Sequence, residues 1–262
     1  MFFYENANST TNSSATPYLY YLITIVKKII PASIKLFLKL LLRKVNDLRK
    51  GYKRKFALTF SGENNFIEVL CIQQPIKPTP SSINKQHNIQ LAAKKMNGLL
   101  IEPGQIFSFW KLAGSPAEKN GYQKSRTIIK GEIDVTVGGG LCQLSGLIYY
   151  MALQAGLKII ERYAHSIDIY TEEERFTPLG SDATVVYGYK DLRFENNFSF
   201  PIMLQFTIEE NVLKGFLFSA EKISLHNISF AYEYKQDSIT VKTLQRDSEN
   251  FTEINSSTYR KL

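Results

Sequence analysis

Apolar residues recur at helical spacing in three segments of the chain. Over residues 34–48 they return every three or four positions, with lysines and arginines on a second face, which predicts an amphipathic basic helix. A second helix is predicted over 83–97, with Gly98 as its C-terminal stop. A third is predicted over 141–155, where one apolar face continues along the segment.

The remaining apolar segments are short, and they favour strands. One strand is predicted at 66–72, and two short strands are expected to form a hairpin around Pro103-Gly104. Further strands are predicted at 158–170, 182–189, 228–234 and 239–244, with a hairpin over 201–219 that turns at Glu210-Asn211. The chain is therefore predicted to be an α+β protein, with a mainly antiparallel sheet packed on the central helix.

The net charge of +8 comes from one segment. Residues 18–55 carry eleven Lys or Arg and one acidic residue, whereas residues 56–262 carry 21 basic and 22 acidic residues. A basic arm on a near-neutral body argues against nucleic acid as a partner, because that function favours a broad basic surface. The arm is expected to lie on an anionic membrane surface or, alternatively, to pack on the body with its charged face in solvent.

These features divide the chain into four parts. Residues 1–17 are rich in Asn, Ser and Thr and are predicted to be disordered, 18–55 form the basic helical arm, 56–220 form the body, and 221–262 add strands and a polar tail. Residues 1–17 lack a basic region of the kind that starts a signal peptide. The protein is therefore expected in the cytoplasm, free or peripheral at the inner face of the membrane, and its oligomeric state is left open.

Cys142 is the residue on which an enzymatic interpretation depends. It follows Gly138–Gly140 and stands at the start of the predicted central helix. A helix N-terminus presents free N–H groups and a positive dipole end, which favour a thiolate and could receive an oxyanion. His165 and Asp182 follow in the order nucleophile, base and orienting acid.

This order is typical of papain-like and transglutaminase-like cysteine enzymes. The stretch CQLSGLIYYMALQAG also resembles the peptidoglycan-peptide hydrolases of the NlpC type, so a core of that kind is a candidate fold. Asp168 and Asp191 are rivals for the third position. The structural alternative is a buried cysteine, a hydrogen-bonded core histidine and a tight glycine turn. The few cysteines and histidines have no metal-ligand spacing, so no metal or cofactor is expected.

The chain resembles the VanW family. The resemblance rests on MNGLLIEPGQIFSFWKLAG, Gly121-Tyr122, GGGLCQLSGLIYYMALQAGLKIIERYAHSIDIY and PLGSDATVVYGYKDLRFENN, in order, over about residues 55–219. VanW proteins are associated with vancomycin B-type resistance, so the resemblance implies the bacterial cell envelope and its peptidoglycan as context. It implies no particular reaction, and it leaves residues 221–262 unexplained.

Three functions are compatible with these observations. The first is a cysteine-dependent amidase, peptidase or acyl transferase acting on a peptidoglycan peptide or precursor. The second is a non-catalytic module that binds the same ligands, and the third is a membrane-peripheral accessory protein. The candidate ligand-binding residues, several of them singled out by the resemblance, are Gly138, Gly139, Gly140, Gln143, Trp110, Tyr163 and Arg162.

Overall fold

The computed structural model describes residues 30–61, 65–78, 80–129, 132–168, 175, 177–247 and 250–261. The segment 1–17, predicted to be disordered, and residues 18–29 of the basic arm lie outside this part of the chain.

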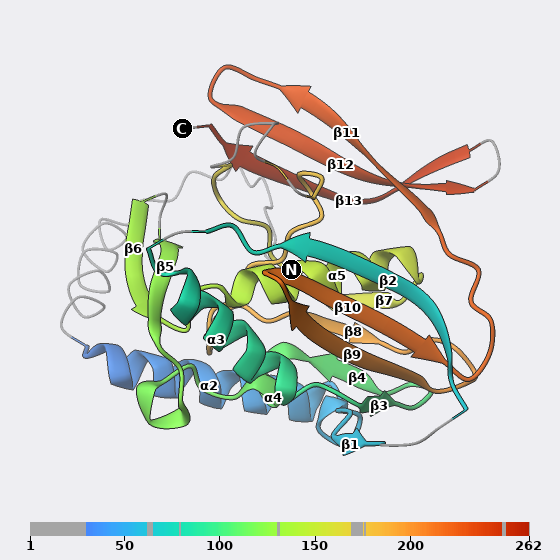
Figure 1. The fold of residues 1–262 in the computed structure, drawn as a ribbon, viewed down its shortest axis with the longest axis horizontal. Helices are drawn as coiled ribbons and strands as arrows, with labels where there is room; N and C mark the ends of the chain where they lie inside the picture. Colours follow the sequence, from blue (N-terminus) through green and yellow to red (C-terminus); the bar gives the residue numbers. More distant parts are fainter. Residues whose placement is uncertain are drawn as a thin grey trace, which may run out of the picture.

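A five-stranded antiparallel sheet forms the middle of the body (Figure 1). In spatial order its strands are β1 (Thr59–Phe60), β3 (Leu99–Ile101), β9 (Ile202–Glu209), β10 (Val212–Ser219) and β2 (Ile67–Pro75). β9 and β10 form the predicted hairpin, and Glu210 and Asn211 both adopt positive φ, as a tight hairpin turn requires.

Helix α5 (Leu141–Gln154) is the predicted central helix, and it packs against this sheet. Its side chains Leu144, Leu147 and Met151 are buried. Gly215 on β10 allows the close approach, because a Cβ atom there would lie 2.3 Å from Cδ2 of Leu147. The other helices are α2 (Ala32–Arg49), α3 (Ser82–Lys94) and α4 (Phe109–Ala113), with short 3-10 turns at Tyr52–Arg54 and Glu118–Asn120.

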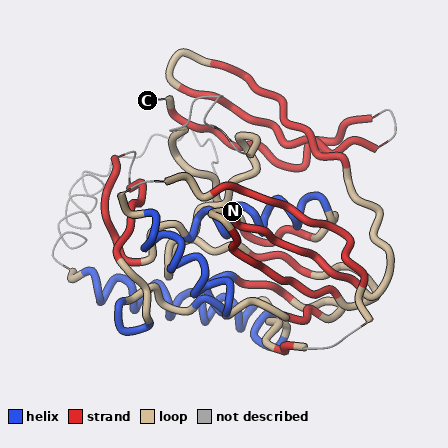
Figure 2. The backbone as a smooth tube through the Cα atoms, viewed as in Figure 1, coloured by secondary structure: helices blue, strands red, loops and turns tan. Residues whose placement is uncertain are grey.

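Three smaller sheets surround this layer (Figure 2). One has the order β4 (Ile106–Ser108), β8 (Arg193–Glu195), β7 (Lys158–Glu161). The hairpin β5 (Lys124–Ile129) and β6 (Glu132–Val137) forms the second. The C-terminal sheet consists of β11 (Asn227–Tyr234), β12 (Ser238–Asp247) and β13 (Asn250–Arg260). The named strands pair antiparallel, so the predicted α+β class with a mainly antiparallel sheet is confirmed.

The hairpin predicted around Pro103-Gly104 was wrong. β3 pairs with β1 and β9, whereas β4 pairs with β8. The turn carries the chain from one sheet to another, and the N–H of Gly104 donates to the carbonyl of Asn196 instead of closing a hairpin.

The strand predicted at 158–170 forms only over 158–161, its residues 169–170 lie outside the described residues, and the strand predicted at 182–189 was wrong. β7 ends at Glu161, and the residues that follow form a loop. Residues 182–189 are a loop as well, in which the N–H of Thr184 donates to the carbonyl of Tyr163. The alternation of apolar residues arises here because the loops pack on α5, where Ala183 and Val185 join the core.

The polar tail contains a strand that was not predicted. β13 runs antiparallel to β12, and its residues Ser257 and Tyr259 are buried. The N–H of Arg260 also donates to the carbonyl of Ser166, which attaches this strand to the loop after β7.

Ionic contacts dock α2 on the body. Asp47 is 4% exposed and accepts a hydrogen bond of 2.6 Å from Arg193 on β8. Arg43 donates two bonds, of 2.9 and 2.8 Å, to Glu161 at the end of β7. Within the described residues, no helix is both long and apolar enough to cross a membrane.

Replacing Asp47 by Ala should destabilise the fold. The change leaves the buried Arg193 without one of its carboxylate partners, and breaking a buried ion pair costs about 3 kcal/mol. Urea denaturation of the full chain measures this loss. In the control Glu118→Ala, a pair with Lys124 whose side chains are both 66% exposed is lost, and the change should stay within about 0.5 kcal/mol. Equal stabilities of the two variants would contradict the docking role of Asp47.

Candidate functional site

Cys142 is the second residue of α5, and the helix begins after Gly140, whose φ is 98°. The side chain is half-buried, and its sulfur lies 3.9 Å from the carbonyl oxygen of Val185. The first turn of an α-helix leaves N–H groups without partners inside the helix, and its dipole end is positive. The sulfur therefore lies where a negative charge is favoured.

The three glycines before Cys142 are required by close packing. A Cβ atom on Gly139 would lie 2.5 Å from the carbonyl oxygen of Ser125, and one on Gly138 would lie 2.7 Å from Pro116. The buried side chain of Asn88 donates to the carbonyl of Gly139 at 3.0 Å. These contacts fix the turn that places Cys142, so the glycines have a structural role.

His165 and Asp182 meet beside Cys142, although each lies on a loop. The carboxylate Oδ2 of Asp182 accepts two bonds from His165, 2.7 Å from its backbone nitrogen and 2.6 Å from ring Nδ1. The imidazole also interacts with the Cys142 thiol, and each of the two groups shifts the pKa of the other. Because Nδ1 faces Asp182, Nε2 is the nitrogen left for the sulfur. The His165 side chain is 30% exposed, so solvent reaches the site.

The charges in this cluster favour a thiolate and an imidazolium. Burial alone would lower the pKa of His165, but the hydrogen bonds with Asp182 and Cys142 raise it from 6.5 to about 10. Burial would raise the pKa of the Cys142 thiol, but the hydrogen bond and positive charge of His165 outweigh it, so that this pKa is lowered. Burial would also raise the pKa of the Asp182 carboxyl, but the hydrogen bond and charge of His165 and the charge of Arg162 hold this pKa well below the usual range. The ion pair is therefore the favoured form at neutral pH.

Two further side chains fix the other oxygen of Asp182. Arg162, at the end of β7, donates from Nη2 at 2.9 Å, and Tyr259 on β13 donates from its hydroxyl. Arg162 also donates to the hydroxyl of Ser257 on the same strand. Burial and the charge of Asp182 raise the pKa of Tyr259, which keeps the phenol protonated as a donor. Sequence analysis missed Tyr259 because it assigned this region to a polar tail.

A hydrogen bond from Ser145 joins α5 to the loop that contains Asp182. Ser145 Oγ donates to the carbonyl of Ala183 at 2.6 Å and is buried. One turn of α5 therefore carries both Cys142 and the residue that positions the Asp182 loop. The two segments also meet at Gly146, where a Cβ atom would lie at an ordinary van der Waals distance, 3.6 Å, from the Cα of Asp182.

The rival aspartates have other partners. Asp168 forms a two-pronged ion pair with Arg175, at 3.1 and 2.8 Å. Asp191 accepts from the hydroxyl of Ser108, from the backbone of Trp110 at the start of α4, and from Arg193. The carboxylate that contacts His165 is that of Asp182.

The candidate ligand-binding residues are dispersed. Arg162 is turned inward to Asp182, with a side chain only 5% exposed. Gln143 donates to the carbonyl of Pro75, and its own oxygen is buried without a partner among the described residues. Trp110 is half-buried, with Nε1 donating to the carbonyl of Lys190. Tyr163 is exposed beside the same lysine.

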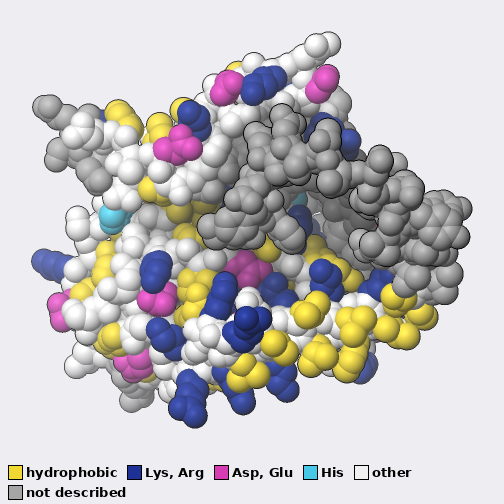
Figure 3. Space-filling model, turned by 180° about the vertical axis from the view of Figure 1, so that it is seen from behind, with side chains coloured by type: hydrophobic (Ala, Val, Ile, Leu, Met, Phe, Trp, Pro, Cys, Tyr) yellow, Lys and Arg dark blue, Asp and Glu magenta, His cyan; other side chains and the backbone are white. Residues whose placement is uncertain are grey.

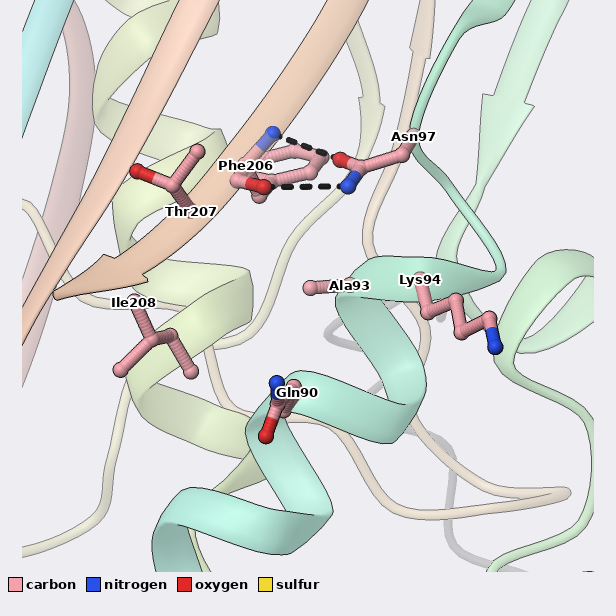
Figure 4. A pocket seen from close by; sticks show the side chains of 7 residues that line it. All are labelled: Gln90, Ala93, Lys94, Asn97, Phe206, Thr207 and Ile208. Atoms are coloured by element: carbon pink, nitrogen blue, oxygen red, sulfur yellow. Dashed lines mark hydrogen bonds between the residues drawn. The ribbon is translucent and has the colours of Figure 1, made fainter.

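Two cavities among the described residues bear on the site. One, of about 300 Å³, lies between α3 and β9, where Asn97 holds the backbone of Phe206 (Figure 4). The other, of about 400 Å³, is lined by Tyr149, Arg162 and His226 among others. Neither lining includes the Cys142 sulfur, although the second adjoins the cluster through Arg162. The described part of the chain has no group of three His, Cys, Asp or Glu side chains that could hold a metal ion.

Comparison with known proteins places this chain in a family. The family model described as "VanW like protein" matches residues 84–218, about half of the chain. The chain belongs to the VanW-like family. It is 35% identical over 136 residues to the vancomycin B-type resistance protein VanW of Enterococcus faecalis, covering 52% of this chain and 50% of that protein.

A second VanW-like relative is the protein YoaR of Bacillus subtilis, described as uncharacterized. It is 37% identical over 125 residues, which cover 48% of this chain and 40% of YoaR. The matched region therefore spans half or less of each relative. No solved structure matches this chain.

The VanW-like region contains Cys142, His165 and Asp182, but it does not contain Tyr259, which lies beyond residue 218. Helix α2, which docks on the body, lies before residue 84 and is also outside the matched region. The C-terminal sheet, which sequence analysis could not explain, thus contributes a hydrogen bond from Tyr259 to the carboxylate of Asp182, a residue inside the VanW-like region.

The alkylation rate of Cys142 should depend on pH as expected for a thiolate stabilised by His165. In the Cys71→Ala background, so that only Cys142 is labelled, iodoacetamide should report an apparent pKa well below the ordinary value of 9.0. Removal of the imidazole in His165→Ala should raise that pKa and slow labelling at neutral pH about tenfold or more.

The matched control is the Cys142→Ala variant, in which Cys71 on β2 is the cysteine that remains to be labelled. Its labelling should not respond to His165→Ala, because Cys71 and His165 have no contact among the described residues. An ordinary apparent pKa for Cys142 that is unchanged by His165→Ala would contradict the ion pair.

Proposed function

We propose that the protein is a cysteine-dependent amidase, peptidase or acyl transferase that acts on a peptidoglycan peptide or precursor. The observation that carries this proposal is the hydrogen bond of 2.6 Å between His165 Nδ1 and Asp182, beside a Cys142 thiol whose pKa is lowered by the same imidazole. A nucleophile, a base and an orienting acid brought together in this way are the arrangement of covalent acyl-transfer catalysis.

The reaction would begin with the thiolate of Cys142. Its sulfur attacks the carbonyl carbon of an amide, and the N–H groups at the start of α5 stabilise the resulting oxyanion. The imidazolium of His165 gives its proton to the departing amine as the carbon–nitrogen bond breaks, which leaves a thioester on Cys142. Water or an acceptor amine then attacks the thioester, its proton passes to His165, and the sulfur leaves as the thiolate.

Asp182 would keep the imidazole in one orientation throughout. Its Oδ2 accepts from Nδ1, so the proton that moves is the one on Nε2. Arg162 and Tyr259 occupy the other oxygen and keep the carboxylate ionised. The carboxylate stabilises the imidazolium without becoming protonated itself.

The family supports the proposed substrate class. One relative is described as a vancomycin B-type resistance protein, and we take the peptides of peptidoglycan and its precursors as the substrates. Those peptides contain the amide bonds that this chemistry requires. A core related to papain-like or NlpC-type enzymes is part of the proposal, supported by the nucleophile at a helix start and by the order Cys, His, Asp.

Turnover of soluble peptidoglycan peptides and disaccharide-peptides by the full chain tests the proposal. Mass spectrometry should detect cleaved or transferred products with the wild type. Cys142→Ala and His165→Ala should each form product at least about 1,000-fold more slowly, as expected for members of one catalytic unit. Cys71→Ala, the matched cysteine control, should retain the wild-type rate.

Two results would contradict the enzymatic proposal. Equal product formation by Cys142→Ala would exclude this nucleophile. Binding of the same peptides without turnover, with equal affinity in wild type and Cys142→Ala, would favour the binding module instead. The exposed ring of Tyr163, whose backbone contacts the Asp182 loop, is the feature that favours this second function.

A further inference from the structure

Helix α2 presents most of its apolar residues to solvent and contacts the body partly through charged residues. Seven large apolar side chains along the helix are between 42% and 64% exposed. They are Ile34, Phe37, Leu38, Leu41, Leu42, Val45 and Leu48. This arrangement is the reverse of an ordinary surface helix, whose apolar face packs on the core.

The contacts of α2 explain this orientation. Arg43 binds Glu161, Asp47 binds Arg193, and the buried side of the helix is completed where Leu36 packs against Gly188. Residues 36, 43 and 47 lie on one face at 3.6 residues per turn, and the exposed apolar residues lie on the opposite face. The body therefore holds α2 by one side and leaves an apolar stripe on the other.

Basic side chains flank the apolar stripe. Lys35 and Lys44 lie on α2 on either side of it, and residues 32–55 contain nine Lys or Arg. The one acidic residue of this segment is Asp47, whose carboxylate is buried against Arg193. Figure 3 shows hydrophobic side chains with Lys and Arg beside them along the lower edge of the molecule, where Figure 1 places α2.

We infer that the outward face of α2 docks the protein on an anionic lipid bilayer surface, with the helix axis in the plane of the membrane. An apolar stripe of this width inserts at the boundary between headgroups and acyl chains, while flanking lysines contact anionic headgroups. The charges in the segment are complementary to such a surface and repel a second copy of the same face. This inference does not depend on the proposed enzymatic activity.

The ion pairs of α2 give the docked protein a fixed orientation. Gly188, which contacts Leu36, and Val185, which contacts the Cys142 sulfur, belong to the same loop. Docking through α2 would therefore fix the orientation of the body, including the loop that contacts Cys142, relative to the lipid surface.

Co-sedimentation with lipid vesicles tests the inference, using the full chain. Vesicles of phosphatidylcholine and phosphatidylglycerol in equal parts should bind the protein at least about tenfold more tightly than phosphatidylcholine alone, and added salt should weaken the binding. Phe37→Gln with Leu41→Gln should weaken binding about tenfold by removing apolar insertion. Lys35→Gln with Lys44→Gln should weaken it roughly 30-fold, since each nearby basic residue is worth about 1 kcal/mol.

The matched control is Ile83→Gln on α3, where the same change is made at a side chain that is 81% exposed. It should bind vesicles as the wild type does, and thermal unfolding should be unchanged in all three variants because none of the altered side chains is buried. Wild-type binding by the Phe37 and Leu41 variant would overturn the inference. So would a protein that sediments as a dimer, becomes monomeric in that variant and does not bind vesicles, because the stripe would then be a contact between copies.

Discussion

The candidate site depends on the carboxylate of Asp182. It accepts hydrogen bonds from the backbone and ring of His165, from Arg162 and from Tyr259, so both of its oxygens are occupied. A half-buried carboxylate with this many donors stays ionised and fixed. Because Asp182 is fixed, Nδ1 of the imidazole is held in one orientation, and the charged ring lowers the pKa of the Cys142 thiol at the start of α5. Without this carboxylate, His165 would be a partly buried imidazole on a loop with its pKa lowered by burial.

The donors to Asp182 come from two separate parts of the chain. Arg162 and His165 both lie on the loop that follows β7, whereas Tyr259 belongs to the C-terminal sheet. The VanW-like region, 84–218, contains the first two but not the third. At the other end of the chain, α2 is attached to β7 and β8 through Glu161 and Arg193, and Glu161 immediately precedes Arg162. Segments on both sides of the VanW-like region therefore support the strand that leads into the site.

The sequence predicted those features that are determined locally. The helix after Gly138–Gly140 was predictable because glycines permit the tight turn and the apolar residues repeat at helical spacing. The β9–β10 hairpin was predictable because Asn tolerates positive φ at the turn. The order of Cys142, His165 and Asp182 was visible in the sequence, and the structure brings these three residues together, whereas Asp168 and Asp191 have other partners.

Features that depend on distant contacts were not predictable. Alternating residues at 162–168 and 182–189 look like strands, yet their backbones form loops, and apolar side chains such as Ala183 and Val185 join the core. Tyr259 was hidden in a polar segment, because its partner Asp182 lies 77 residues away. The outward orientation of the α2 apolar face could not be read from amphipathicity alone, since it is set by Asp47 binding Arg193, 146 residues further on.

The most direct test of this account is an NMR titration of the His165 imidazole in the full chain, assigned with a His165→Gln variant. The account predicts that His165 remains an imidazolium through neutral pH and loses its proton only near pH 10, because Asp182 and the Cys142 thiolate stabilise the charged ring. A His165 that titrates near its ordinary value of 6.5 would contradict it, since neither the thiolate nor the orienting carboxylate would then act on the ring.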